Sequence, residues 1–162
     1  MNGVSATEFA PDSTLSRAMA VTMLYRMEGE PAAAAGALFD DVAAGKWYTD
    51  AVLWASDQGI ADGYGNGRFG PNDNITRQQL AVILYRYAQS KGQGFAGAWM
   101  FPLDYPDASE VSGWADEAMH WMVMNGVISG KDGKLAPKDT LTRAEMAVIL
   151  KTFNTLPAEE AE

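Results

Sequence analysis

An arginine stands at the same place in three similar stretches of the chain. Each stretch has an apolar residue and a proline, a short polar run, Ile or Leu, Ser or Thr, the arginine, and then a helical run of apolar residues. The three arginines are Arg17, Arg77 and Arg143. A cation in the first turn of a helix faces the positive end of the helix dipole, so this placement is mildly unfavourable. Its threefold repetition therefore indicates a use.

The sequence is compatible with two chemical roles for these guanidinium groups. Free N–H groups at a helix start, together with a guanidinium that offers two parallel hydrogen bonds, favour a carboxylate or phosphate ligand. Alternatively, each arginine pairs with Asp41, Asp107 or another nearby acid and locks adjacent repeats together. The two roles are compatible with each other.

The residues around each arginine predict a helix start. Thr142 with Glu145 matches a capping box, and Thr76 with Gln79 is an acceptable variant of it. Ser16 keeps only the hydroxyl half of the pattern. We therefore expect a helix to begin after each of these three hydroxyl residues.

The complete repeat spans residues 39–87 and contains two helices. A short helix is expected over about residues 49–58, with Gly59 as its stop, and a longer one from Thr76 to about residue 89. A glycine-rich loop, GYGNG, lies between them. The pattern then restarts, and Gly126 takes the place of Gly59.

Only the second half of the repeat is present at the start of the chain, because Gly3 aligns with Gly63 and nothing matches the residues before Gly63. The first repeat therefore looks truncated, with a helix over about residues 17–27. The expected organisation is a partial repeat and linker (1–36), a second repeat with a glycine-rich linker (37–102), a third repeat (103–156) and an acidic tail (157–162). The expected fold class is an all-α helical repeat domain.

Four tryptophans occur at two matched positions of the repeat. Trp54 and Trp121 lie inside the expected short helices and are assigned to the core. Trp47 and Trp114 lie at the start of those helices, where an amphipathic ring could stack on a sugar face or pack in the core.

Composition narrows the classes of partner. The 162 residues carry a formal net charge of −9 and no cysteine. An acidic chain is a poor match to nucleic acid or an anionic membrane, since both reward clustered Lys and Arg. No apolar run is long enough to cross a bilayer, and the N-terminus lacks the zones of a signal peptide. We therefore expect no nucleic-acid partner and no membrane insertion.

Catalysis and metal binding are weaker interpretations. Adjacent acids, Asp40 with Asp41 or Asp116 with Glu117, could be an acid and base pair for glycoside hydrolysis, but neighbouring acids are more often solvated. His120, the only histidine, is expected to be a packing or surface residue. Four loop residues could be offered as metal ligands: Asp62, Asn66, Asn72 and Asp73. Their spacing does not match that of a calcium-binding loop, so we interpret them as turn-forming residues. No enzyme activity, metal or cofactor is expected, whereas a protein-binding helical scaffold remains an alternative.

The ordered set of motifs resembles the S-layer homology (SLH) family. FDDV, Trp47, QGIADG, GRFGP and ITRQQLA carry the resemblance in the second repeat, and YPDA, Trp114, NGVISG, KLAP and LTRAEMA carry it in the third. The resemblance implies a pseudo-threefold arrangement of helix-loop-helix repeats that anchors exported proteins to the bacterial cell wall. Its implied ligand is a secondary cell-wall polysaccharide that often bears pyruvate ketals, and its implied location is the cell surface.

A pyruvyl ketal supplies one carboxylate on a sugar, which fits the argument from the arginines. On the resemblance, Arg77 and Arg143 would pair with the carboxylate, with Arg17 on the same motif. Trp47 and Trp114 would line the sugar. Four further residues complete the expected binding set: Gly59 and Gly126, for close backbone approach in grooves between repeats, and Asp41 and Asp107.

Two departures from the family pattern affect the expected sites. SRAM in the first repeat and TRQQ in the second lack the glutamate of the motif, and the first repeat lacks its tryptophan-bearing helix. At most two complete grooves are therefore expected in one chain. The exposed edge of the first repeat is expected to allow self-association.

Overall fold

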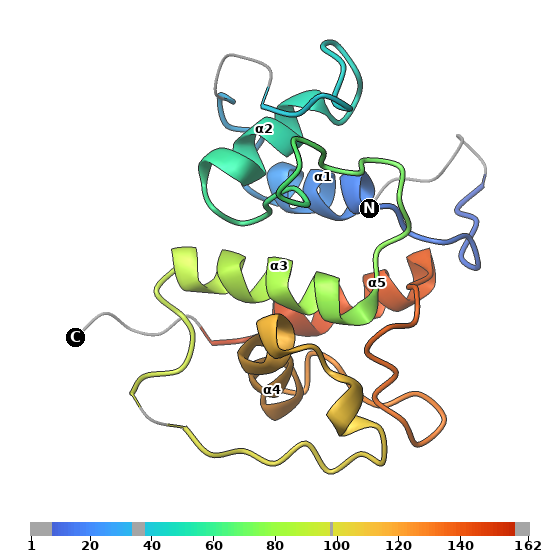
Figure 1. Ribbon diagram of the computed structural model, residues 1–162, viewed down its shortest axis with the longest axis vertical. Coiled ribbons are helices and arrows are strands. Elements are labelled where there is room, and N and C mark those ends of the chain that lie inside the picture. The colour runs from blue at the N-terminus through green and yellow to red at the C-terminus, as the bar shows by residue number, and fades with distance from the viewer. Residues whose placement is uncertain (1–7, 34–37, 98, 158–162) are drawn as a thin grey trace. The chain divides into compact units, whose positions relative to one another are not determined.

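A computed structural model describes residues 8–33, 38–97 and 99–157. Over these residues the chain is helical, with isolated bridges in place of strands, which confirms the all-α class (Figure 1). The expected match of Gly3 with Gly63, the linker residues 34–37 and the acidic tail from residue 158 lie outside the described residues.

The chain divides into two compact units whose boundaries cut the repeats in half. One unit is Leu15–Ile75, and the other runs from Thr76 onward and includes the N-terminal residues up to Thr14. Each boundary lies just before the second helix of a repeat. A unit therefore joins the second helix of one repeat to the first half of the next.

The first unit is built on two helices, α1 (Arg17–Met27) and α2 (Thr49–Asp57). They pack against each other through aromatic rings, with the centroids of Tyr25 and Trp54 5.6 Å apart. The glycine-rich loop and the turn at residues 70–74 follow α2 and complete the unit.

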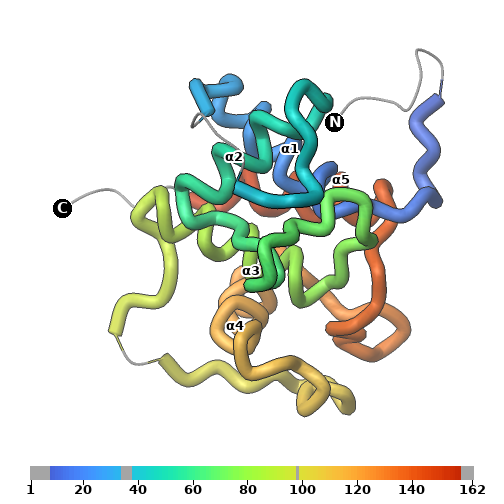
Figure 2. The backbone as a smooth tube through the Cα atoms, turned by 45° about the horizontal axis from the view of Figure 1, so that its top comes forward, coloured from blue at the N-terminus to red at the C-terminus, as the bar shows by residue number. Residues whose placement is uncertain are grey.

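The second unit repeats this pairing with α3 (Arg77–Ser90) and α4 (Asp116–Met124). Tyr85 and Trp121 take the places of Tyr25 and Trp54, at 5.4 Å between centroids. Two short 3₁₀ helices precede α4, namely η1 (Ala108–Glu110) and η2 (Gly113–Ala115), and α5 (Arg143–Phe153) closes the third repeat. The long connection between α3 and η1 can be followed in Figure 2.

The expected helix starts are confirmed. Thr76 and Thr142 are N-caps with complete capping boxes, closed by Gln79 and Glu145, and the Ser16 side chain accepts only the backbone N–H three residues on. Capping satisfies N–H groups that a helix leaves unpaired in its first turn. Sequence and structure agree at all three helices.

The core contains the inner tryptophans, as expected. Trp54 is 6% exposed in the first unit, and Trp121 is 5% exposed in the second. None of the helices in the described part of the chain has the length and apolarity needed to cross a bilayer.

Candidate functional site

The guanidinium of Arg17 is buried in the first unit and bonded to backbone carbonyls. Its Nε donates to the Phe69 oxygen at 2.9 Å and its Nη2 donates to the Asp62 oxygen at 3.0 Å. The rings of Tyr64 and Phe69 lie 4.7 and 4.9 Å from its Cζ, within the range of cation–π attraction. Arg17 therefore ties α1 to the glycine-rich loop that follows α2.

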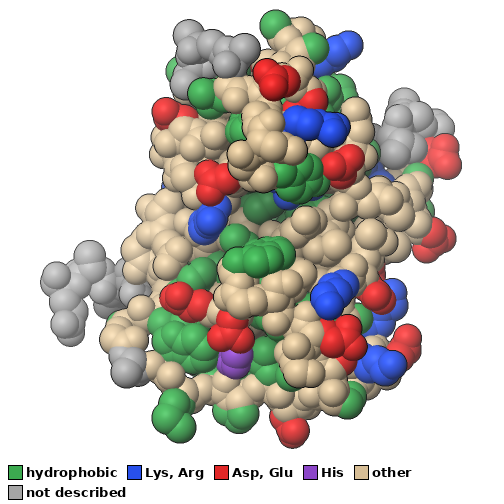
Figure 3. Space-filling model, in the orientation of Figure 1, with side chains coloured by type: hydrophobic (Ala, Val, Ile, Leu, Met, Phe, Trp, Pro, Cys, Tyr) green, Lys and Arg blue, Asp and Glu red, His purple; other side chains and the backbone are tan. Residues whose placement is uncertain are grey.

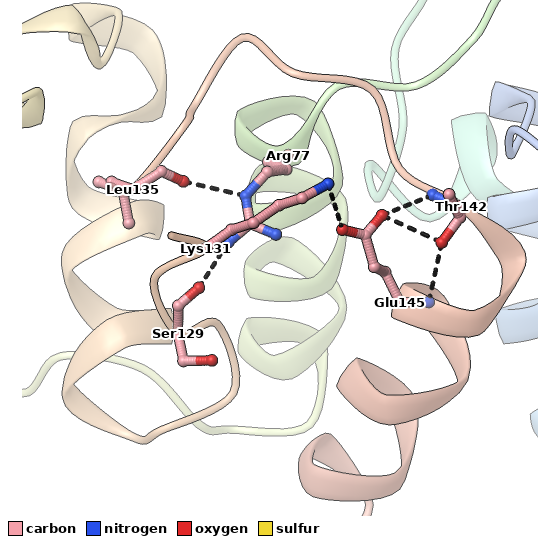
Figure 4. A network of polar contacts seen from close by, with 6 residues as sticks. All are labelled: Arg77, Ser129, Lys131, Leu135, Thr142 and Glu145. Atoms are coloured by element: carbon pink, nitrogen blue, oxygen red, sulfur yellow. Dashed lines mark hydrogen bonds and ion pairs between the residues drawn. The ribbon is translucent and has the colours of Figure 1, made fainter. Parts of the chain in front are cut away.

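Arg77 makes the same contacts in the second unit (Figure 4). Its Nε donates to the Leu135 oxygen at 2.9 Å and its Nη2 donates to the Ser129 oxygen at 2.6 Å. The Nε of Arg143 donates to the Phe9 oxygen at 2.9 Å, so the third arginine uses the N-terminal segment. All three arginines are 5% exposed.

The first N–H groups of these helices are also occupied, which corrects the expectation that they are free for an anion. In α3, the N–H of Arg77 donates to the Asp139 oxygen at 2.9 Å and the N–H of Gln78 donates to the Pro137 oxygen at 2.9 Å. The corresponding groups of α1 bond to Asp73 and Pro71, and those of α5 bond to Ser13 and Pro11. The polar turn ahead of one arginine motif therefore caps another helix.

Asp41 does not pair with an arginine of the motif, which corrects the expectation of a direct ion pair. Its carboxylate accepts the backbone N–H groups of Phe69 and Gly70 at 2.8 and 2.9 Å. Asp107 accepts those of Leu135 and Ala136 in the same way, both at 2.8 Å.

In each unit, the aspartate of one repeat and the arginine of the preceding repeat therefore bond to the backbone of the same residue. Phe69 donates its N–H to Asp41 and offers its oxygen to Arg17, and the corresponding shared residue in the second unit is Leu135. We call this chain of contacts the loop lock. It holds consecutive repeats together with no ion pair between the two side chains.

The loop lock shifts the acidity of its aspartates. Desolvation of the Asp41 carboxylate favours the neutral acid, but the hydrogen bonds from Phe69 and Gly70 outweigh it and hold the pKa of Asp41 below its ordinary value. The same balance of desolvation and backbone hydrogen bonds lowers the pKa of Asp107. Both carboxylates are thus ionised at neutral pH.

The loop lock does not use every donor of the Arg17 and Arg77 guanidinium groups. An arginine has five N–H donors, and the loop lock uses one on Nε and one on Nη2. Thr22 Oγ1 is the sole buried side-chain polar atom without a partner in the described part of the chain. The Nη1 groups of Arg17 and Arg77, which bond to no described residue, are consequently reached by solvent.

The surroundings of the two open edges differ. In the first unit Tyr64 covers Arg17, and its hydroxyl donates to Asp73 at 2.9 Å. In the second unit Lys131 takes the place of Tyr64 in the loop, and its Nζ donates to Glu145 Oε1 at 3.1 Å (Figure 4). Sequence reasoning missed Tyr64 and Lys131, although both directly follow a matched glycine in the loop.

Trp47 and Trp114 lie on the surface, at 58% and 60% exposure. Packing in the core, one of the two interpretations of these residues, is therefore wrong. The Trp47 ring contacts Tyr48 edge-on at 5.1 Å between centroids. Matched exposure of a large aromatic ring in two repeats leaves a sugar-stacking role open.

Gly59 and Gly126 end α2 and α4 with positive φ angles of 65° and 67°. A backbone in this region explains the glycines without a ligand. A Cβ added at either position would meet nothing within 4 Å, so the space over both residues is open.

The remaining candidate residues serve local structure. Asn66 Oδ1 accepts the N–H of Arg68, and Asp73 accepts the Tyr64 hydroxyl, as turn residues do. The His120 ring lies 4.7 Å from Trp99 and its Nδ1 lies 2.8 Å from the Asp116 oxygen. In the described ranges no cluster of three His, Cys, Asp or Glu residues could hold a metal ion.

Surface charge is mixed on the face drawn in Figure 3, where Lys and Arg side chains lie among Asp and Glu side chains. A protein that binds nucleic acid through its backbone phosphates instead gathers basic residues on one face. The expectation of no nucleic-acid partner stays a prediction from the sequence.

Helix pairs joined by a loop lock define a helical repeat module. The family model described as "S-layer homology domain" matches residues 38–81 and 104–147, more than half of the chain. The chain belongs to the S-layer homology family. These matches cover the second and third repeats.

Relatives align over nearly the whole chain. A surface-layer 125 kDa protein of Lysinibacillus sphaericus is 34% identical over 92% of this chain and 12% of its own length. An endoglucanase of Bacillus sp. (strain KSM-635) is 31% identical over 94% of this chain and 16% of its own length. A cellulosome-anchoring protein of Acetivibrio thermocellus is 24% identical over 93% of this chain and 34% of its own length. The chain thus spans a small part of each relative.

Proposed function

We propose that this chain is a non-catalytic module that anchors a protein to the bacterial cell wall by binding an acidic polysaccharide, such as one with pyruvate ketals. Membership of the S-layer homology family supports the anchoring role. So do relatives named as surface-layer and cellulosome-anchoring proteins. The presence of one module in a surface-layer protein and an endoglucanase fits a shared attachment role rather than a shared reaction.

The exposed pair Trp47 and Trp114 is the observation that carries the sugar-binding part of the proposal. Their inner counterparts are buried, so the repeat places one tryptophan in the core and leaves the other in water. More than half of each outer ring stays accessible at the matched position, so both indoles can take part in binding. An amphipathic ring suits the apolar face of a sugar.

The acidic substituent is assigned to the open edges of the arginines. Arg17 and Arg77 keep Nη1 donors at the surface while the loop lock fixes their position, so a carboxylate would meet a cation whose side chain is already ordered. Arg143 shares the motif and completes the proposed set. Gly59 and Gly126 leave open space for a sugar, and Asp41 and Asp107 act by holding the loops.

Retention on purified secondary cell-wall polysaccharide tests the proposal. The Trp47→Ala, Trp114→Ala double variant should lose most of its retention, because each stacked ring contributes about 1 kcal/mol or more to binding. Met100→Ala, Val148→Ala is the matched control, since it also removes two exposed apolar side chains. Thermal unfolding of both variants verifies that each is folded.

Equal retention of the tryptophan variant and the control would contradict sugar stacking. Failure of the unmodified chain to bind any cell-wall polysaccharide would favour the helical protein-binding scaffold instead. Alanine at Arg77 is a poor test, because it also breaks the loop lock.

A further inference from the structure

The chain contains three asparagines that directly precede a glycine, namely Asn2, Asn66 and Asn125. In such a pair the backbone nitrogen of the glycine can attack the side-chain amide of the asparagine, because glycine has no Cβ to hinder the approach. Asn66 and Asn125 lie in the described part of the chain. Their surroundings differ in the features on which this reaction depends.

The Asn66–Gly67 pair is exposed in the glycine-rich loop of the first unit. Gly67 has a φ angle of 81°, and its carbonyl oxygen accepts the N–H of Asp40 at 2.8 Å. No described residue accepts the N–H of Gly67 itself. The nitrogen that must attack is therefore not held by a hydrogen bond within this part of the chain.

The side chain of Asn66 is oriented for the reaction. Its Oδ1 accepts the N–H of Arg68 at 3.2 Å, which folds the amide back over the peptide unit of Gly67. Attack at Asn66 Cγ puts negative charge on Oδ1, and an N–H that is already directed at this oxygen stabilises the charge. The turn thus places the electrophile beside the nucleophile and supplies a donor to the developing oxyanion.

The Asn125–Gly126 pair is protected from the same reaction. Asn125 is the C-cap of α4, and its Nδ2 donates to the Trp121 oxygen at 2.8 Å. The N–H of Gly126 donates to the Val123 oxygen at 3.0 Å. Both reacting groups must therefore break a hydrogen bond before they can meet.

The third repeat has an acid at the position of Asn66, in a loop that is one residue shorter. Asp132 precedes Gly133 in a turn that two backbone hydrogen bonds close, at 2.7 and 3.0 Å. An aspartate is therefore compatible with this turn. An isoaspartate instead adds a methylene to the main chain, and in the first unit it would lie inside a turn closed by the hydrogen bond from Tyr64 N–H to the Arg68 oxygen at 2.8 Å.

We propose that Asn66 is a site of spontaneous deamidation, which converts it to aspartate and isoaspartate in the folded protein. The Gly67 nitrogen gives its proton to hydroxide and bonds to Asn66 Cγ, and the side-chain nitrogen takes a proton from water and leaves as ammonia. Water then opens the resulting cyclic imide. Addition at Cγ gives aspartate, whereas addition at the main-chain carbonyl carbon gives isoaspartate. This modification is independent of carbohydrate binding.

The isoaspartate form weakens the loop lock of the first unit. Its longer main chain opposes the hydrogen bond between Tyr64 and Arg68 and the one from Asp40 to Gly67. Phe69, whose backbone bonds to both side chains of the loop lock, follows this turn directly. Aged protein should therefore unfold more readily than fresh protein.

Peptide mapping of aged protein tests the proposal. Trypsin places Asn66 and Asn125 in separate peptides, residues 47–68 and 92–131. After incubation in mildly alkaline buffer, peptide mass reports deamidation, and labelling by a protein isoaspartate methyltransferase reports isoaspartate. Asn66 should convert at least about tenfold faster than Asn125, because one hydrogen bond that must break before attack is enough to slow a reaction by this factor. In guanidinium chloride the two rates should become similar.

Asn66→Ser is the matched variant, because a serine hydroxyl can keep the turn but cannot form the imide. Ageing should lower the melting temperature of the unmodified chain by about 2 °C or more and leave that of Asn66→Ser unchanged. Asn66→Asp carries the new charge without the extra methylene, so its melting temperature should resemble that of the fresh chain.

Equal conversion of Asn66 and Asn125 in the folded chain would overturn the proposal. A rate difference that persists in guanidinium chloride would also overturn it, since the fold would then not be the cause. If ageing destabilised Asn66→Ser as much as the unmodified chain, the effect on the loop lock would be refuted.

Discussion

At the scale of single residues, the loop lock is the central finding. A buried guanidinium is usually matched by a carboxylate, yet Arg17 and Arg77 are matched by carbonyl oxygens of a loop. The aspartates act one step away, by holding the N–H groups of that same loop. The arginine therefore serves the fold first, and any ligand must use the donors that remain.

Replacing Arg77 by lysine should destabilise the protein. The planar fork donates to Leu135 and Ser129 from two nitrogen atoms, and a lysine ammonium cannot reproduce that geometry. We expect Arg77→Lys to lower the free energy of unfolding by ~1 to 3 kcal/mol in urea titrations. Arg26→Lys is the control, because Arg26 is exposed and makes only a surface ion pair with Glu30. Equal stability of the two variants would argue against the loop lock.

Acid should weaken the loop lock. Because the pKa values of Asp41 and Asp107 are lowered in the folded state, their contribution is complete above the ordinary value of 3.8 and is lost as the pH falls through the folded-state pKa. We expect the Asp41→Asn, Asp107→Asn variant to be less stable at neutral pH and to lose less stability between about pH 5 and pH 2. Urea titrations across this range measure both effects, with Asp104→Asn as the control for loss of an exposed acid. An unchanged pH slope in the double variant would contradict the assignment.

At the scale of elements, close packing explains why two loop positions without a positive φ angle are glycine. Gly63 and Gly130 have ordinary φ angles, yet an added Cβ would collide with the loop carbonyl and with the ring of Phe39 or Tyr105. The Tyr105 hydroxyl also accepts the N–H of Gly130 at 3.0 Å. These glycines let the aromatic residue that opens a repeat lie against its loop.

Gly130→Ala should therefore lower stability, whereas Gly113→Ala should not. A Cβ at Gly130 overlaps the Tyr105 ring and lies 3.1 Å from the Lys134 oxygen, so we expect a loss of ~1 to 3 kcal/mol in the free energy of unfolding. A Cβ at Gly113 meets nothing within 4 Å. Thermal and urea unfolding of both variants give the comparison. A Gly130→Ala variant as stable as Gly113→Ala would show that the loop moves aside at little cost.

Sequence patterns predicted the helices because capping and apolar periodicity act locally. Thr76, Thr142 and Ser16 marked the three second helices, and the inner tryptophans were correctly assigned to the core. The hydrogen-bond partners of the arginines could not be predicted in this way. They are backbone carbonyl oxygens, which every residue type has, so the sequence does not mark them. The same limit explains the wrong expectation of free N–H groups, which are filled by turns from another repeat.

At the scale of the whole molecule, the chain is a family module that spans a small part of its relatives. Its contacts join the second helix of one repeat to the first half of the next, so a single repeat would leave its arginine without a loop. The arginines of the proposed site therefore keep their position only when two consecutive repeats are folded together. The proposed ligand contacts at Trp47, Trp114 and the arginines require a folded pair of consecutive repeats.

Binding to the polysaccharide with and without its acidic groups tests the central claim most directly. Secondary cell-wall polysaccharide is prepared in native form and after mild removal of its pyruvate ketals, and the affinity of the unmodified chain for each is measured by calorimetry. The account predicts at least about tenfold weaker binding to the stripped polymer, because charge-assisted hydrogen bonds to the arginines are lost. Equal affinity for both forms would contradict recognition of an acidic substituent.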